Sequence, residues 1–271
     1  MKVAICLHGY FGTLSTNDFS TVHKGFAHIE SKVASLADEV DFYVHCWQPE
    51  FKSDIEKLYS PKKAIYEEQK DFESICKENK ISQEYIDRGF PWPRSSTMYK
   101  NANAERILSF YYSRCQSLDL VENKNYDFVM TTRFDISQRG GPEVRELKFD
   151  RNLDNDYLYT AEWNQKNVGY GDMWFYASPD IMHTYSQIYK HALVDFKKES
   201  NYEKCLTTGW PDSQYFNVFS PTDPRQFSNE MDRKEKSKNL MKFPRWRVTD
   251  CHLHHKWFCM QTGLYQKTKW L

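Results

Sequence analysis

The sequence predicts an α/β protein with a mixed, mainly parallel sheet flanked by helices, and three observations lead to this prediction. Residues 2–9 (KVAICLHG) form a continuous apolar run, which is typical of a parallel strand buried on both faces. A second run of this kind, VDFYVHCW, occupies residues 40–47. Between them, residues 26–40 place apolar side chains at helical spacing, so strand and helix alternate as they do in α/β folds.

The alternation continues through the first half of the chain. Residues 52–90 are charged and are predicted to be mostly helical, with a short strand at 63–69. A long amphipathic helix is predicted at 101–123, because its apolar residues form one stripe. That stripe consists of Ile107, Phe110, Tyr111, Cys115, Leu118 and Val121. The next apolar run, YDFVMTTRFDI at 126–136, predicts a further strand of the sheet.

The second half opens with two more predicted strands. They occupy residues 156–163 (DYLYTAEW) and 169–178 (GYGDMWFYAS), the latter beginning with two glycines. A helix is predicted at 178–196, with Ser178 as its N-cap and Pro179 as its first residue.

The remainder of the chain is less regular. Another helix is expected to begin within 208–219, and the polar, charged segment 221–244 lacks periodicity and is predicted to be a loop. The tail, 246–261, is apolar and rich in histidine. The chain shows neither repeats nor a low-complexity linker, so we predict a single composite domain over 1–271.

Charge and hydropathy exclude several classes of protein. The chain has 271 residues, and its 37 Lys and Arg residues equal its 37 Asp and Glu residues in number. Because proteins that bind nucleic acid or membrane surfaces usually carry a basic excess, neither partner is expected. No apolar stretch approaches the roughly 18 residues that a membrane span needs, so no transmembrane segment is predicted.

The cysteines indicate the compartment. There are seven, an odd number, and no two form a CxxC pair. Several lie inside apolar runs, which favours buried, reduced thiols in a cytoplasmic protein; Cys251 and Cys259 alternatively pair or bind metal. The first residues lack the apolar core and cleavage site of a signal peptide, so we expect a cytoplasmic location.

A charged pair follows the buried strand at 126–136. Arg133 and Asp135 lie at its carboxyl end, and His8 and His45 end two other strands at the same predicted edge. Open sheets bind ligands outside the carboxyl ends of their strands, so these residues predict a site. Arg can clamp a phosphate through two hydrogen bonds, and Asp can bind a divalent cation. The alternative is a surface ion pair at the end of a strand.

Glycines follow the first strand in the segment LHGYFGT. They would let the backbone approach a nucleotide, but the segment matches neither the GxGxxG fingerprint nor the P-loop. An ordinary turn is the alternative reading of this segment.

Five segments, taken in order, resemble a group of GT-A-type glycosyltransferases of bacterial capsule or lipopolysaccharide synthesis and large-virus glycan synthesis. They are KVAICLHG, VDFYVHCW, the stretch from Ser109 to Ser137, GDMWFYASPDIM and WPDSQYFN, which together run from residue 2 to about 219. The strongest segment is 108–136. The resemblance implies a Rossmann-like, GT-A-like fold with a nucleotide-sugar-binding half at 1–137. It also implies an acceptor-binding half at 138–271, which includes the C-terminal loop and tail.

Enzymes of this group mostly hold Mn²⁺ or Mg²⁺ through an Asp-x-Asp motif. The matching positions here are Arg133, Phe134 and Asp135, so Arg replaces the first Asp and full metal dependence is in question. Asp135 is the implied metal ligand, and Arg133 is expected to contact the donor or to pair with a carboxylate. Arg cannot ligate a metal, because it stays protonated.

The resemblance also implies contacts with the nucleotide sugar. The loop after the first strand would contribute His8, Gly9, Tyr10 and Gly12, with Tyr10 as a stacking face for the base. Arg106 and Tyr112 lie off the apolar stripe of the long helix and are expected to face the nucleotide.

Two carboxylates are candidates for the base that deprotonates the acceptor, if the enzyme inverts. They are Asp172 in GYGDMWFY and Asp212 in WPDSQYF. A carboxylate suits that task when it lies within hydrogen-bond reach. The alternatives are a turn aspartate at Asp172 and a helix-start aspartate, favoured by the helix dipole, at Asp212.

The histidine-rich tail supplies further candidate ligands. His252 and His254 share a face if the segment is extended, and both are candidate metal ligands. Ordinary surface histidines are the alternative, and Lys256 or Arg247 could equally neutralise phosphate.

The sequence therefore predicts a glycosyltransferase that moves a sugar from a nucleotide-diphosphate-sugar donor to a hydroxyl of a glycan acceptor. One alternative is a sugar nucleotidyltransferase, which would normally show a glycine-rich N-terminal motif with a basic residue that LHGYFGT lacks. The other is an inactive carbohydrate-binding protein, which the missing first Asp favours.

Overall fold

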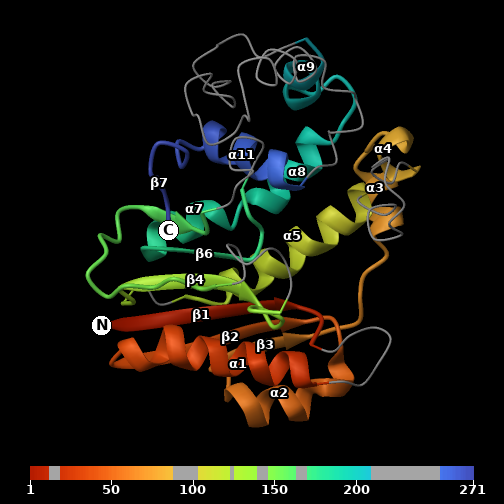
Figure 1. The fold of residues 1–271 in the computed structure, drawn as a ribbon. Helices are drawn as coiled ribbons and strands as arrows, with labels where there is room; N and C mark the ends of the chain where they lie inside the picture. The colour runs from red at the N-terminus through yellow and green to blue at the C-terminus, as the bar shows by residue number, and fades with distance from the viewer. Residues whose placement is uncertain (12–18, 88–102, 123–124, 139–145, 163–169, 209–250) are drawn as a thin grey trace, which may run out of the picture.

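The fold is a seven-stranded mixed sheet with helices on both faces (Figure 1). The computed structural model describes residues 1–11, 19–87, 103–122, 125–138, 146–162, 170–208 and 251–271. The strand order is β3-β2-β1-β4-β6-β5-β7. The predicted fold class, α/β with a mainly parallel sheet and flanking helices, is confirmed.

The first four strands are parallel, as their buried apolar runs predict. They are β1 (Lys2–Gly9), β2 (Glu39–Cys46), β3 (Lys63–Tyr66) and β4 (Phe128–Arg133). β1 is central to this group, since β2 and β4 both pair with it in parallel and β3 pairs with β2. Their carboxyl ends therefore meet at one edge of the sheet.

The remaining strands reverse the direction. β6 (Trp174–Ala177) is antiparallel to β4, and β5 (Leu158–Thr160) is antiparallel to β6. β7 (Thr268–Trp270), which the sequence did not predict, pairs in parallel with β5. Because β6 runs against β4, the residues just before β6 lie at the edge where β4 ends.

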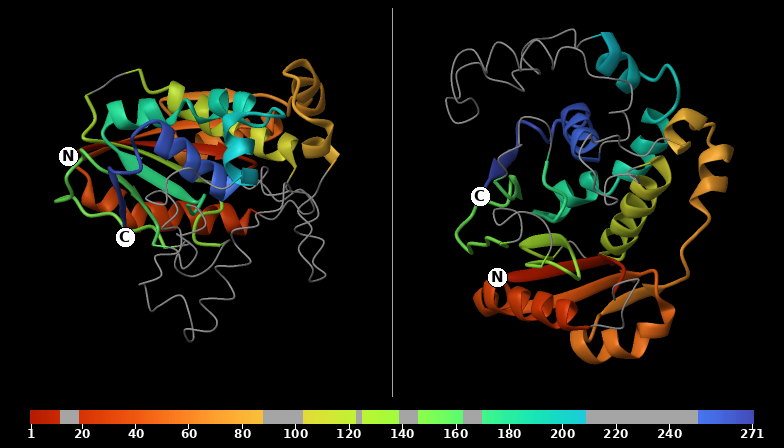
Figure 2. Two further views of the ribbon diagram at one scale, coloured as in Figure 1. Left: turned by 90° about the horizontal axis from the view of Figure 1, so that it is seen from above. Right: turned by 45° about the vertical axis from the view of Figure 1, so that its right-hand side comes forward.

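Helices cover the two faces unequally (Figures 1 and 2). One face carries α1 (Ser20–Lys32) and α2 (Lys52–Tyr59), which enclose the odd-numbered side chains of β1. The other face carries α5 (Ala104–Asp119), with further helices packed around it. Those are α3 (Phe72–Glu78), α4 (Gln83–Asp87), α7 (Pro179–Tyr185), α8 (Ile188–Asp195), α9 (Asn201–Thr208) and α11 (Cys251–Gln261).

α1 begins six residues earlier than the predicted start at residue 26, and it contains a glycine. A Cβ on Gly25 would lie 2.2 Å from the carbonyl oxygen of Phe134. Only glycine permits so close an approach of the helix to the chain that leaves β4. The helix thus lies directly against the turn that carries Asp135.

Other predicted elements also differ from the structure in their bounds, such as the strand predicted at 169–178, which spans only Trp174–Ala177. The helix predicted at 178–196 is divided into α7 and α8, because the hydroxyl of Ser186 donates to the carbonyl of His183 at 2.9 Å and ends the first helix. The strand predicted at 126–136 ends at Arg133, and Asp135 lies in the following turn. The helix expected within 208–219 lies outside the described residues, except for Thr208 at the end of α9.

The described cysteines have free thiols, and none of the described helices is long and apolar enough to cross a membrane. Cys251 and Cys259 both lie in α11 and are not joined. The thiols of Cys6, Cys115 and Cys259 are buried, and burial raises the pKa of each.

Candidate functional site

Three polar side chains stand in register across the carboxyl ends of neighbouring strands. His8 of β1 pairs with His45 of β2 on one side and with Arg133 of β4 on the other. Because side chains alternate along a strand, all three share the face of Cys6, which packs against α5. The sequence prediction that these strand ends meet at one edge is confirmed.

The topology makes this edge a switch point of the sheet. From β1 the chain continues to β2 and β3 on one side, and it returns to β4 on the other side of β1. The strand order thus reverses between β1 and β4. In open α/β sheets, ligands bind at such a switch point, outside the carboxyl ends of the strands.

Arg133 and Asp135 form a two-bond ion pair at this point. Nε of Arg133 donates to Oδ1 of Asp135 at 2.8 Å, and Nη2 donates to Oδ2 at 2.8 Å. Both side chains keep some exposure, 26% for Arg133 and 16% for Asp135. Burial alone would lower the pKa of Arg133, but the nearby carboxylates outweigh it and raise that pKa.

Asp172 completes a charged cluster with this pair. It precedes β6, and its Oδ2 lies 3.9 Å from Nη1 of Arg133. Burial opposes ionisation of Asp172, but His252, Arg133 and Arg114 together lower the pKa of its carboxyl group. Asp172 is therefore ionised, and the ionised form is the one that can accept a proton.

Arg114 of α5, which sequence reasoning missed, is the most buried charged residue of this region. Its side chain is fully buried, and its guanidinium carbon lies 4.3 Å from the ring centre of Phe110. Its spacing from Ile107, Tyr111 and Leu118 places it within the apolar stripe of the helix. That spacing was the available signal, since a cation in a core stripe needs buried partners.

The partners of Arg114 come from four other parts of the chain. Nε donates to Nε2 of His8 at 3.2 Å, and Nη1 donates to the hydroxyl of Tyr185 and to Nε2 of His255, both at 2.7 Å. Nη2 donates to the backbone carbonyl of Asp172. One side chain thus ties α5 to β1, α7, α11 and the entry to β6.

His8 is buried beside this arginine. Burial, followed by the charges of Arg114 and Arg133, lowers its pKa well below the usual value, so the ring is neutral. Its Nδ1 has no hydrogen-bond partner within the described part of the chain. His8 therefore lies buried at the carboxyl end of β1, next to Arg133, and its expected contact with the donor stays a prediction.

Gly9 and Tyr10 continue from β1 at the same edge. Gly9 has φ of +102°, a conformation that favours glycine, and its N–H donates to Oγ of Ser113 at 2.9 Å. The hydroxyl of Tyr10 bonds to the side chain of Gln69. The predicted contact Gly12 lies outside the described residues.

Tyr112 and Arg106 both lie on α5 but differ in setting. Tyr112 stacks on Trp47 with ring centres 5.5 Å apart, and Lys70 lies over its ring at 5.2 Å. Tyr112 thus belongs to an aromatic cluster with His45, Trp47 and Phe72. Arg106 is exposed in the first turn of the helix, where its backbone N–H is capped by Asn103 at 3.1 Å.

The histidines of the tail lie on a helix, which corrects the reading of that segment as extended. An α-helix has about 3.6 residues per turn, so side chains two positions apart point to nearly opposite sides. His252 and His254 therefore do not share a face. His252 lies near Asp172 and bonds through Nδ1 to the carbonyl of Tyr170 at 2.7 Å. His254 is buried elsewhere, with Nε2 3.1 Å from Oδ2 of Asp195.

The described residues do not form a ready metal site. Among them, no group of three or more His, Cys, Asp or Glu side chains is placed to hold an ion. Both carboxylate oxygens of Asp135 already accept hydrogen bonds from Arg133. Because both ring nitrogens of His254 lie against Asp195 and Tyr111, the structure separates it from Asp135.

Other candidates are not tested or lie elsewhere. Asp212 and Arg247 are outside the described residues. Lys256 is buried in α11 with its Nζ 5.6 Å from the ring centre of Tyr265, so it is not an exposed phosphate ligand.

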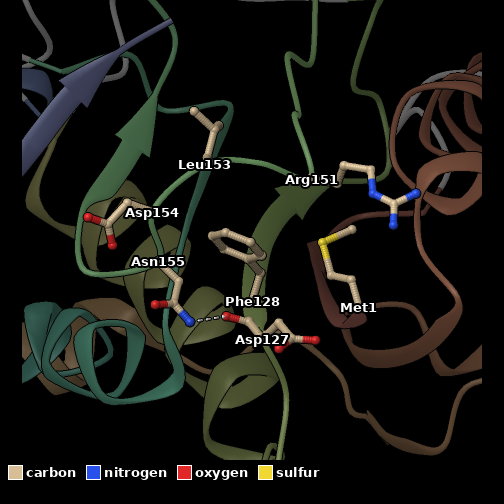
Figure 3. A pocket seen from close by; sticks show the side chains of 7 residues that line it. All are labelled: Met1, Asp127, Phe128, Arg151, Leu153, Asp154 and Asn155. Carbon is tan, nitrogen blue, oxygen red and sulfur yellow. Dashed lines mark hydrogen bonds between the residues drawn. The ribbon is translucent and has the colours of Figure 1, made fainter.

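A separate pocket lies at the opposite edge of the sheet (Figure 3). It is lined by Met1, Asp127, Phe128, Arg151, Leu153, Asp154 and Asn155. Met1 and Asp127 precede β1 and β4, so this pocket lies at the amino ends of the strands. It is distinct from the charged cluster of Arg133, Asp135 and Asp172 at the carboxyl ends of the strands.

Comparison with known proteins gives one structural similarity. Neither a protein-family model nor a curated protein matches the chain. The apo structure of mouse xyloside xylosyltransferase 1 is similar with a TM-score of 0.36 and 12% identity, covering 100% of this chain and 84% of that chain.

Proposed function

We propose that this chain is a glycosyltransferase that moves a sugar from a nucleotide-diphosphate-sugar donor to a hydroxyl of a glycan acceptor. The observation that carries the proposal is the meeting of Arg133, Asp135 and Asp172 at the switch point between β1 and β4. A cation and two carboxylates at that point match the charges that this reaction must handle. The resemblance of the sequence favours a capsular, lipopolysaccharide or viral glycan as the acceptor.

Arg133 would stabilise the leaving diphosphate. Negative charge grows on that group as the glycosidic bond breaks, and a fixed cation lowers the energy of the transition state. Nε and Nη2 of Arg133 hold Asp135, whereas Nη1 makes no hydrogen bond within the described residues. Nη1 is therefore the edge of the guanidinium that we assign to a phosphate oxygen.

Asp172 would accept the proton of the attacking hydroxyl. Its lowered pKa keeps it ionised at neutral pH, so it can take a proton without first losing one. The acceptor would then lie beside Asp172, where the chain enters β6. This role applies if the reaction inverts the configuration of the sugar.

A divalent ion is proposed to arrive with the donor. Mg²⁺ is commonly held by one or two carboxylates together with substrate phosphates, and Asp135 is the carboxylate here that would serve. Such an ion would supply charge stabilisation beside Arg133. Asp135 would have to give up at least one of its bonds to Arg133.

An inactive nucleotide-sugar-binding protein is the second candidate, and one observation favours it. Arg133 occupies the place of a metal-binding carboxylate and engages both oxygens of Asp135. A protein built in this way could bind a diphosphate without transferring the sugar.

The deciding experiment titrates a panel of nucleotide sugars by calorimetry, with and without Mn²⁺, and follows each mixture by mass spectrometry. Transfer to an added glycan, or slow hydrolysis of one donor, would support the glycosyltransferase. Binding of a donor with neither outcome would indicate the inactive binding protein. Formation of a nucleotide sugar from a sugar phosphate and a nucleoside triphosphate would indicate a sugar nucleotidyltransferase.

A further inference from the structure

Arg114 is a buried cation whose hydrogen-bond partners are all uncharged. It is fully buried, and within the described residues its guanidinium forms no ion pair. Buried charges in proteins are normally paired with an opposite charge. The carboxylate of Asp172 provides compensation, since the charge of Arg114 helps to lower its pKa.

The guanidinium dictates the protonation of two histidines. Arg can only donate hydrogen bonds, so Nε2 of His8 and Nε2 of His255 must both be acceptors. The remaining proton of each neutral ring therefore sits on Nδ1. For His255 that proton has a partner, because the carbonyl of Cys251 lies 2.7 Å from Nδ1.

The same guanidinium holds the backbone of Asp172. Nη2 of Arg114 donates to its carbonyl oxygen, just before the chain enters β6. The side chain of Asp172 extends from this anchored backbone toward Nη1 of Arg133. Loss of the anchor would release the carboxylate from a fixed position while leaving Arg133 and Asp135 joined.

We propose that Arg114 is a positioning residue of the strand-end site, which anchors Asp172 and imposes the Nδ1–H tautomer on His8. Arg114 touches no ligand in this role, since it is fully buried. Its effect on turnover rests on the proposed glycosyl transfer, whereas its effect on the histidines does not. The two effects are therefore measured separately.

The first measurement concerns the histidine rings in isotope-labelled protein. The nitrogen chemical shifts of His8 and His255 are recorded by NMR and assigned with His8→Gln and His255→Gln variants. In the parent protein we expect both rings to be neutral with the proton on Nδ1. In Arg114→Met we expect at least one ring to become a mixture of tautomers, and unchanged tautomers in the folded variant would overturn the proposal.

The second measurement concerns turnover of a donor that the parent protein accepts. Arg114→Lys keeps the charge but cannot reach all four partners, so kcat should fall by roughly tenfold or more. Donor affinity should change by less than about threefold, because Arg114 does not contact the donor. The matched control is Cys115→Ala, a buried neighbour on the same helix, for which kcat should stay within about twofold of the parent value. An unchanged kcat in folded Arg114→Lys would overturn the proposal.

A milder variant covers the case in which neither substitution at Arg114 folds. Tyr185→Phe removes one acceptor of the guanidinium but keeps its charge, and we expect a drop in kcat of about two- to fivefold. A folded Tyr185→Phe protein with parental kcat would count against the proposal. If the parent protein binds no nucleotide sugar, the proposed function fails and the tautomers of His8 and His255 alone decide the role of Arg114.

Discussion

Arg133 donates a hydrogen bond to each carboxylate oxygen of Asp135 across a turn, and both N–O distances are 2.8 Å. The two residues are separated by Phe134, whose buried ring packs on the opposite face of the sheet. β4 ends at Arg133, so the turn rather than strand alternation brings Asp135 back to it. The pair is thus a product of local chain geometry, and its two members can be tested separately.

Asp135→Asn preserves the shape of the side chain but removes its charge. We expect a large loss of transfer and weaker metal-dependent donor binding, because a hard divalent cation prefers a carboxylate. The melting temperature should change little, since the side chain is not fully buried. Activity, donor affinity with Mn²⁺ and thermal melting are measured together. As a control, Glu146→Gln breaks the exposed pair with Lys32 and should leave all three unchanged. Wild-type turnover in Asp135→Asn would show that the site assignment is wrong.

Arg133→Ala should weaken binding of a diphosphate donor far more than binding of the free nucleoside. The lost charge-assisted contact should cost about 1.5–3 kcal/mol of donor affinity. The variant should also depend more steeply on added Mn²⁺, because no second cation then shares the diphosphate charge. Calorimetry across a metal titration measures both effects. Arg151→Ala, at the opposite edge of the sheet (Figure 3), is the control and should bind like the parent. Equal losses for nucleoside and diphosphate would assign Arg133 a structural role only.

Gly25→Ala tests the contact between α1 and the turn after β4. Alanine normally stabilises a helix by about 1 kcal/mol relative to glycine. Here its Cβ would meet the backbone oxygen of Phe134 at 2.2 Å, so we expect a net loss of stability and weaker donor binding. Urea denaturation gives the free energy of unfolding. Lys24→Ala, on the exposed side of the same helix, should be nearly neutral. A stabilised Gly25→Ala protein would contradict the close approach.

Lys256 provides a prediction about pH. Burial lowers its pKa from 10.5 to about 8, so the folded protein disfavours the charged form. Between about pH 8 and 10.5 the unfolded chain binds more protons at this residue, and the stability of the parent protein should rise with pH there. Below about pH 8 the full cost is present.

Lys256→Met removes that cost. The variant should therefore exceed the parent in stability at pH 7, by an amount on the order of 3 kcal/mol if no other contact is lost, and the gap should close toward pH 10. Denaturation at several pH values measures the gap, with Lys204→Met on the exposed side of α9 as the control. A gap that does not vary with pH would show that Lys256 is uncharged throughout or is well paired.

Strong local patterns explain which parts of the molecule could be predicted. The buried runs of β1, β2 and β4 and the stripe of α5 are long and regular, and each was assigned correctly in type. α11 was harder, because His254, His255 and Lys256 are buried polar residues that obscure its helical period. β7 has only three residues and depends on pairing with a distant strand, which no local pattern reveals.

The site divides in the same way. Arg133 and Asp135 were expected from the end of a predicted strand and Asp172 from the sequence resemblance, and the structure brings the three together. The place of Arg114 in the apolar stripe was visible in the sequence, but its partners were not, because they come from segments up to 141 residues away. The shared face expected for His252 and His254 assumed an extended segment, whereas both residues lie on α11, whose helical period was too weak to recognise.

The antiparallel pairing of β4 with β6 has a consequence for the length of the chain. Thr132 is paired with Trp174, so Arg133 and Asp172 are held together by the ladder of the sheet. The length of the chain between them has little effect on the entropic cost of bringing them together, because each doubling of a loop's length adds only about 0.6 kcal/mol. A change in the length of the chain between the two strands should therefore leave Arg133 and Asp172 side by side. The pairing of the two strands can in this way preserve the geometry of the charged cluster while the chain that connects them changes.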